Sequence, residues 1–116
     1  MANEFSIDRA SREGITILRV SGRLDAKNAQ QLMNACHEAR SAGAGRVIVN
    51  LADITFVASS GIGTLLALTE EFREGGGSIH LVSLSDAVTS VVELLNLRQF
   101  LNIGVSEKGA LETIGG

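Results

Sequence analysis

The chain of 116 residues contains no proline, tryptophan or tyrosine, a single cysteine and only two histidines. One cysteine excludes an internal disulfide and any metal site built from several cysteines. Histidine is the most frequent general acid or base in enzymes, and Lys27 and Lys108 are the only lysines, so little of the usual catalytic repertoire is present. We therefore predict that the protein is not an enzyme and uses no metal or other cofactor.

An excess of positive charge and long apolar runs are also lacking. Ten Lys and Arg stand against thirteen Asp and Glu, a net charge of −3, which disfavours nucleic-acid binding driven by phosphate neutralisation. No apolar run approaches the ~20 residues of a membrane-spanning helix, and the first residues lack the features of a signal peptide. With 45% apolar and 20% charged residues, the chain is predicted to be one globular cytoplasmic domain, residues 1–116, that does not insert into membranes.

Apolar residues recur with alternating strand-like and helix-like spacing along the whole chain. Strand character is found at residues 4–8, 14–21, 46–51, 78–83 and 99–105. Helical spacing is found at 27–42, from about 59 to 75, after a cap at Ser85, and in a short segment that starts at Ser106. The order ββαβαβαβα predicts an α/β domain with a mixed, mostly parallel sheet of about five strands flanked by about four helices.

In a parallel sheet, ligands and partners usually meet the loops at the carboxyl ends of the strands. Two predicted loops fall there, residues 22–25 and 53–61. The second ends in Ala58-Ser59-Ser60-Gly61-Ile62-Gly63, which is predicted to open a helix. Such a helix start has unpaired N–H groups and favours anions. A simpler interpretation of the same residues is that Ser59 or Ser60 only caps the helix.

The run from Val47 to Gly63, VIVNLADITFVASSGIG, resembles the signature of STAS domains, and specifically that of bacterial anti-sigma factor antagonists. In that family a hydrophobic strand leads into a D-S-S-G-(L/I)-G motif and an amphipathic helix. Three further stretches agree in order and spacing: Ser21-Gly22-Arg23-Leu24-Asp25, residues 74–82 and residues 85–103. The resemblance covers nearly the whole chain.

The resemblance implies a regulator that is phosphorylated at Ser59 by its partner, a GHKL-type serine kinase that is also the anti-sigma factor. The unphosphorylated form binds this partner and frees its target, phosphorylation blocks binding, and a PP2C-type phosphatase restores the free serine. Carried over by position, the partner-binding residues are Asp25, Ala58, Ser59, Ser60, Gly61 and Ile62.

One position departs from the family, because Ala58 stands where the acidic residue precedes the serine pair. Kinase recognition or loop geometry can differ as a result. Two alternatives therefore stay open: a STAS subunit of a lipid-transporting ABC system, and a partner-switch regulator whose target is not a sigma factor. A dinucleotide site is disfavoured because Leu66 occupies the position of the third glycine.

Several residues outside the serine loop have ordinary structural interpretations. Cys36 is predicted to lie on the apolar side of its helix, His37 to face water, and His80 to be a hydrogen-bonded or edge residue of a strand. Val88, Val91, Val92 and Leu95 are predicted to face inward, as are Leu94 and Leu97. If the leucines are exposed instead, they extend the surface offered to a partner.

Overall fold

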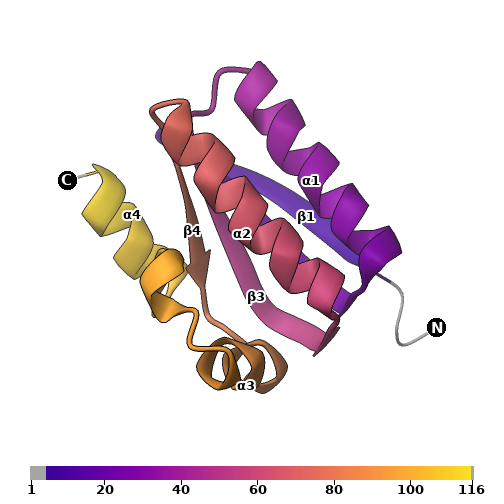
Figure 1. Cartoon of the computed structure of the whole chain (residues 1–116). Coiled ribbons are helices and arrows are strands. Elements are labelled where there is room, and N and C mark those ends of the chain that lie inside the picture. Colours follow the sequence, from indigo (N-terminus) through magenta and orange to yellow (C-terminus); the bar gives the residue numbers. More distant parts are fainter. Residues whose placement is uncertain (1–4, 116) are drawn as a thin grey trace.

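The computed structural model describes residues 5–115. Five strands form one sheet in the order β1-β2-β3-β4-β5: β1 Ser6–Arg12, β2 Ile15–Leu24, β3 Arg46–Val57, β4 Ser78–Val82 and β5 Ile103–Gly104. β1 is antiparallel to β2, and all other neighbours are parallel. Four α-helices connect or follow them, α1 Ala26–Ser41, α2 Ser59–Glu74, α3 Asp86–Leu94 and α4 Glu107–Gly115, with a 3-10 turn η1 at Arg98–Phe100 (Figure 1). The predicted fold class is confirmed.

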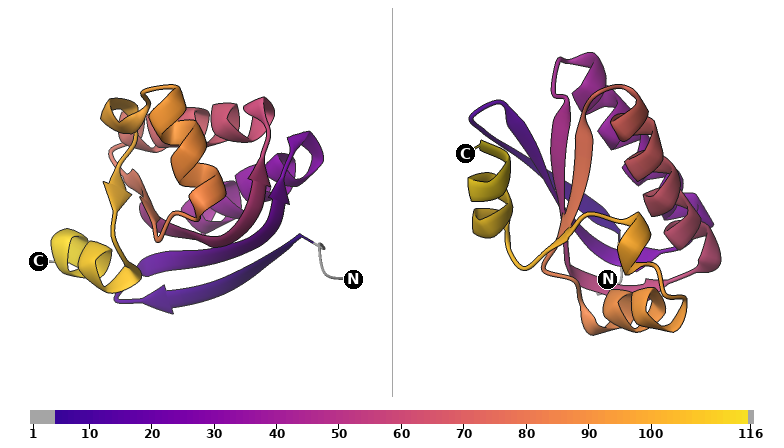
Figure 2. Two further views of the ribbon diagram at one scale, coloured as in Figure 1. Left: turned by 90° about the horizontal axis from the view of Figure 1, so that it is seen from below. Right: turned by 60° about the vertical axis from the view of Figure 1, so that its left-hand side comes forward.

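Helices α1, α2 and α3 cover one face of the sheet, and α4 covers part of the other (Figure 2). The larger core lies under the first three helices, where Leu18, Leu32, Val49, Leu68 and Phe72 are at most 1% exposed. The smaller core joins Ile15, Ile17, Ile48 and Val82 to Ala110 of α4. The run Val47-Ile48-Val49 is buried on both faces, as the sequence predicted.

β1 and β2 form a hairpin, and its turn is shorter than the gap between the strands predicted at 4–8 and 14–21. Glu13 and Gly14 both have positive φ, 54° and 82°, which is the geometry of a two-residue hairpin turn, so β1 continues to Arg12. Glu4, the predicted first residue of this strand, lies outside the described residues. The predicted strand at 99–105 is also wrong over most of its length, because η1 takes up its first two residues and only Ile103–Gly104 pair with β4.

The loops predicted at 22–25 and 53–61 are strand up to Leu24 and Val57, respectively. β2 runs to Leu24, and β3 runs to Val57 in parallel pairing with it. The register shifts twice, between Arg19 and Ser21 and between Gly22 and Arg23, and each shift places one extra residue on β3. These bulges break the two-residue alternation of apolar side chains, so the segment is read as a loop from its sequence.

A charged network fastens α4 to the sheet. The Glu107 carboxylate accepts hydrogen bonds from Arg19 Nε at 2.8 Å, Arg19 Nη2 at 2.9 Å and Asn50 Nδ2 at 2.7 Å. These donors lower the pKa of Glu107 from its ordinary value of 4.5 to about 2, and the hydrogen bond from Arg19 is the largest cause. α4 is thereby held over the smaller core by a paired charge at its first residue.

We expect Glu107→Gln to lower the free energy of unfolding by about 1–2 kcal/mol at pH 7, because hydrogen bonds to a charged group are lost. A carboxylate with a lowered folded-state pKa stabilises the fold above its unfolded pKa, and this contribution disappears as the pH falls from about 4.5 to about 2. Urea denaturation of both proteins at pH 7, 4 and 2.5 measures the difference. If the difference in free energy of unfolding between the two proteins stays constant over this pH range, packing and not charge holds α4 against the sheet.

Candidate functional site

The carboxyl ends of β2 and β3 lie side by side and carry both predicted partner segments. Leu24 pairs with Val57 in the sheet, and the Ala58 N–H donates a hydrogen bond to the Leu24 carbonyl oxygen at 3.0 Å. Asp25 follows β2 directly, and Ser59 follows Ala58 at the start of α2. The structure therefore brings Asp25 and the serine pair to one end of the sheet, as strand polarity predicted.

Ser59 and Ser60 are the first two residues of α2, and both are exposed. Neither serine caps this helix. The N-cap is Ala58, at φ −86° and ψ 166°, and no side chain caps the helix start. Its first turn also contains no acidic residue. The positive end of the α2 dipole is therefore left to solvent next to two hydroxyl groups, and the capping interpretation of the serines is wrong.

Asp25 has a structural role at the start of α1. It is the N-cap of α1, and its Oδ1 accepts a hydrogen bond from the Asn28 N–H at 3.0 Å. The side-chain amide of Asn28 in turn donates to the Arg23 carbonyl oxygen at 2.9 Å, which fixes the passage from β2 into α1. The half-buried carboxylate of Asp25 thus compensates the positive end of α1, and no such carboxylate stands at the start of α2.

Gly61 and Ile62, also assigned to the partner surface by position, are buried. A Cβ atom added to Gly61 would lie 2.4 Å from the Leu24 carbonyl oxygen, so only glycine allows α2 to approach β2 this closely. Ile62 is 4% exposed and packs into the larger core. In this conformation the two residues support the serine loop, while Ser59 and Ser60 are presented to solvent.

An exposed aromatic side chain near this end of the sheet was not predicted. Phe56 is 39% exposed, and the guanidinium carbon of its strand neighbour Arg23 lies 4.1 Å from the ring centroid. Leu24 and Val57, the next residues along, pack into the larger core. Because successive strand residues alternate between faces, Phe56 and Arg23 point to the opposite face from α1 and α2. The phenylalanine between Thr55 and Val57 was the available sequence signal.

The predicted burial is wrong for two leucines at the end of α3: Leu94 is 82% exposed and Leu95 is 52% exposed. Leu97 is half-buried and packs against the larger core, as predicted. α3 ends at Leu94, and Asn96 follows with a positive φ of 56°, so the chain turns away before the side chains of Leu94 and Leu95 can reach the core. Val88 and Val92 are the buried residues of this helix, and the Ser85 cap is confirmed by its 3.3 Å hydrogen bond from the Val88 N–H.

Cys36 and His80 have the structural roles expected of them, whereas His37, predicted to face water, is half-buried and paired with Glu71. Cys36 is fully buried, and burial raises the pKa of its thiol to about 12, so it stays protonated. His37 Nε2 lies 2.8 Å from Glu71 Oε1, and His80 Nε2 lies 2.8 Å from Ser78 Oγ. Over residues 5–115, no cluster of His, Cys, Asp and Glu is arranged to hold a metal ion. Within the same residues, every helix is too short or too polar to cross a membrane.

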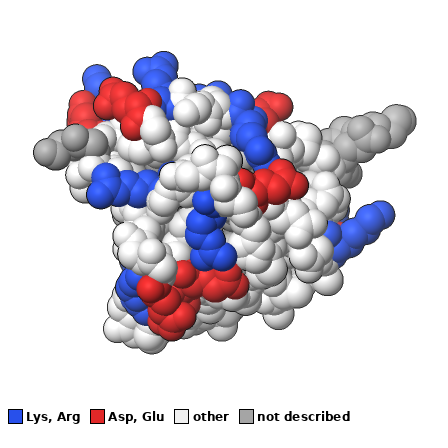
Figure 3. Space-filling view, turned by 90° about the horizontal axis from the view of Figure 1, so that it is seen from above, with Lys and Arg blue, Asp and Glu red and all other residues white. Residues whose placement is uncertain are grey.

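Charged side chains of both signs are mixed over the opposite end of the molecule. Figure 3 views this end, where α1 and α2 finish, and shows Lys and Arg interspersed with Asp and Glu. Arg40 and His37, for example, both approach Glu71, at 3.6 and 2.8 Å. This face therefore presents no extended surface of one sign that would attract a polyanion.

We expect Ala58→Asp to stabilise the protein by about 1 kcal/mol, because aspartate at an N-cap accepts hydrogen bonds from the first turn. The extended backbone at residue 58 already has the geometry that a capping residue adopts. The midpoint temperature of thermal unfolding should rise by roughly 4 °C. Ala58→Asn is the uncharged control and should give a similar gain. If neither variant is more stable than the wild type, other groups already accept hydrogen bonds from the N–H groups at the start of α2.

Three comparisons place this geometry among known proteins. Residues 6–110 match the family model of the STAS domain. An anti-sigma-B factor antagonist of Staphylococcus aureus is 18% identical over 99 residues, which cover 85% of this chain and 92% of that protein. The structure of the anti-sigma factor antagonist SpoIIAA in its unphosphorylated form has a TM-score of 0.74 and 24% identity, covering 97% of this chain and 98% of SpoIIAA. The phosphorylated form of the Bacillus SpoIIAA has a TM-score of 0.69 and 24% identity, covering 96% of this chain and 99% of that one.

The mixed five-stranded sheet, with three helices on one face and a serine pair opening α2, defines the class of a small α/β domain. The family match extends over most of the chain. This chain belongs to the STAS domain family.

Proposed function

We propose that this protein is an anti-sigma factor antagonist that acts by binding, without catalysis of its own, and that phosphorylation of Ser59 controls its binding. The observation that carries the proposal is the position of Ser59, exposed at the uncapped start of α2 in a chain of this family. A relative of similar length is an anti-sigma-B factor antagonist, which supports the same class of target.

In this proposal the unphosphorylated protein docks on an anti-sigma factor that is also a GHKL-type serine kinase, and its sigma factor is released. The kinase then transfers the γ-phosphoryl group of ATP to the Ser59 hydroxyl oxygen, which loses its proton, and ADP leaves. The modified protein dissociates until a PP2C-type phosphatase hydrolyses the phosphate ester. Asp25, Ala58, Ser59 and Ser60 frame the docking surface, and the buried Gly61 and Ile62 hold it in place.

The effect of the phosphate is expected at the interface, not in the fold. A phosphoserine adds about −1.5 to −2 charges at neutral pH. At the start of α2 this charge meets a helix dipole that no acidic side chain already compensates, so the isolated domain tolerates it. A buried dianion without a partner costs several kcal/mol of hydration, and each 1.4 kcal/mol corresponds to about tenfold in affinity.

The proposal is tested by incubating the protein with its anti-sigma factor kinase and ATP and mapping the phosphate by mass spectrometry. We expect one phosphate, on Ser59. Ser60→Ala is the matched control, since Ser60 is the adjacent exposed hydroxyl, and it should still be phosphorylated. Phosphate only on Ser60 or Thr64 would overturn the assignment. Capture of ATPase or permease subunits equally by wild type and Ser59→Asp would instead indicate a transporter component.

A further inference from the structure

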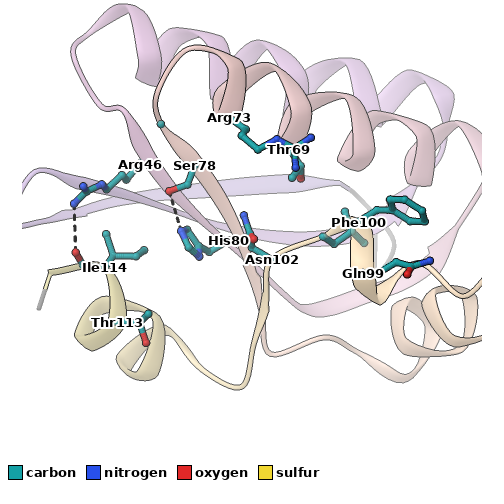
Figure 4. Close-up of a pocket in the computed structure, with 12 residues that line it drawn as sticks. Arg46, Thr69, Arg73, Ser78, His80, Gln99, Phe100, Asn102, Thr113 and Ile114 are labelled. Carbon is teal, nitrogen blue, oxygen red and sulfur yellow. Dashed lines mark hydrogen bonds between the residues drawn. The ribbon is translucent and has the colours of Figure 1, made fainter.

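A cavity of about 470 Å³ lies at the open edge of the sheet, remote from the serine loop. It exists because β5 is short: β5 pairs only with Leu81 and Val82, so the first half of β4 has no β5 neighbour. The side-chain amide of Asn102 covers part of this edge by donating to the Ile79 carbonyl oxygen at 3.0 Å. The rest of the edge remains as a space between the end of α2, β4 and α4 (Figure 4).

The cavity is lined by positive, neutral polar and apolar side chains. Its twelve lining residues include Arg46, Arg73 and His80 but no aspartate or glutamate, although the chain as a whole is acidic. Figure 4 shows the two arginines on different walls, with the His80–Ser78 pair between them. Arg46 Nη1 donates only a long hydrogen bond, 3.3 Å, to the Ile114 carbonyl oxygen. Arg73 pairs with Glu70 of its own helix, an exposed contact that holds a guanidinium weakly.

His80 forms the floor of this space and is half-buried. Burial, and next to it the positive charge of Arg46, lower the pKa of His80, so the imidazole is neutral at pH 7. The charged groups that line the space around it are Arg46 of β3 and Arg73 of α2. α4 and the β4–β5 connection contribute the uncharged Thr113 and Asn102. A negative charge in the cavity would therefore meet two arginines and no acidic lining residue.

An apolar groove continues the cavity past Phe100. This second space, about 510 Å³, shares Arg73, Gln99 and Phe100 with the first and adds Leu66, Ala67 and Leu97. Glu70 stands at its rim, as the partner of Arg73. Phe100 is 56% exposed and lies where the two spaces join. A ligand that filled both would need an anionic end and a flat apolar end.

We propose that these joined cavities bind a small amphiphilic anion, with a phosphate or carboxylate group between Arg46, Arg73 and His80 and an apolar ring packed on Phe100. The positive charge of the two arginines selects an anionic head group. The exposed ring of Phe100, with Leu66 and Leu97, selects an apolar ring in the rest of the ligand. The site is independent of the switch at Ser59, which opens the other end of α2.

The test is an NMR titration of the labelled protein with phenyl phosphate, and in parallel with inorganic phosphate, benzoate and phenol. Phenyl phosphate and benzoate carry both features, whereas inorganic phosphate and phenol carry one each. We expect phenyl phosphate or benzoate to bind at least tenfold more tightly than inorganic phosphate and phenol, with the largest shifts at His80, Phe100 and Asn102. Whichever of the two binds better identifies the head group as phosphate or carboxylate.

Variants decide whether the arginines recognise the head group. The double variant Arg46→Gln/Arg73→Gln should weaken the better ligand at least tenfold, while Arg12→Gln, an exposed arginine on the opposite edge strand, should leave binding unchanged. The ligand should also raise the pKa of His80, because a bound anion stabilises the protonated ring. The proposal would be overturned if phenol bound as tightly as the better anionic ligand, or if Arg12→Gln weakened binding as much as the double variant. NMR shifts spread over all exposed arginines would also overturn it.

Discussion

Replacing Ser59 with aspartate is expected to weaken binding to the anti-sigma factor about a hundredfold or more and to leave the fold intact. The new carboxylate stands on an exposed residue at the start of α2 and would lose its hydration when a partner covers it. A loss of about 2.8 kcal/mol is enough for a hundredfold, and an unpaired buried charge costs more. Calorimetric titration of the anti-sigma factor with both proteins measures the effect.

The thermal stability of the same variant should change by only a few degrees, and upward if at all. An acidic residue in the first turn interacts favourably with the helix dipole, by about 0.3–1 kcal/mol, and α2 has no other acid there. Ser59→Asn separates charge from size, because asparagine has nearly the shape of aspartate and should keep most of the affinity. If Ser59→Asn binds as weakly as Ser59→Asp, steric exclusion and not charge operates the switch.

Much of this site was predictable because it depends on local chemistry and strand polarity. The serine pair precedes an apolar pattern of helical spacing, so it was placed at a helix start, and Asp25 was placed in the loop that follows a predicted strand. Parallel strands then require the two segments to meet at one end of the sheet, which the hydrogen bond between Ala58 and Leu24 confirms. What stayed open was which residue caps α2, since capping depends on where the preceding strand ends.

The parts that were not predicted depend on long-range pairing. β3 reaches Val57 because β2 lies beside it, and two bulges hide this from a search for alternating residues. Likewise Leu94 and Leu95 were predicted to face inward and are exposed. Helical spacing identifies a stripe, but its ends are set by where the neighbouring elements stop.

Two nearby glycines of α2 should respond in opposite directions to alanine substitution. Gly61→Ala is expected to lower the free energy of unfolding by about 2 kcal/mol, because the new Cβ would lie 2.4 Å from the Leu24 carbonyl oxygen and 2.9 Å from Leu24 Cγ. A backbone carbonyl in a paired strand cannot rotate away, so α2 must move. Gly63→Ala meets nothing within 4 Å and should gain up to about 1 kcal/mol from better helix propensity.

The same comparison shows how strongly the fold supports the switch. If α2 moves away from β2, the hydrogen bond from Ala58 to the Leu24 carbonyl is strained, and the serine pair shifts relative to Asp25. Gly61→Ala should then weaken partner binding at temperatures where the variant is still fully folded. Urea unfolding of both variants and the same calorimetric titration measure this. Unchanged stability in Gly61→Ala would show that α2 can yield without cost, and the close packing against Leu24 would then have no role in presenting Ser59.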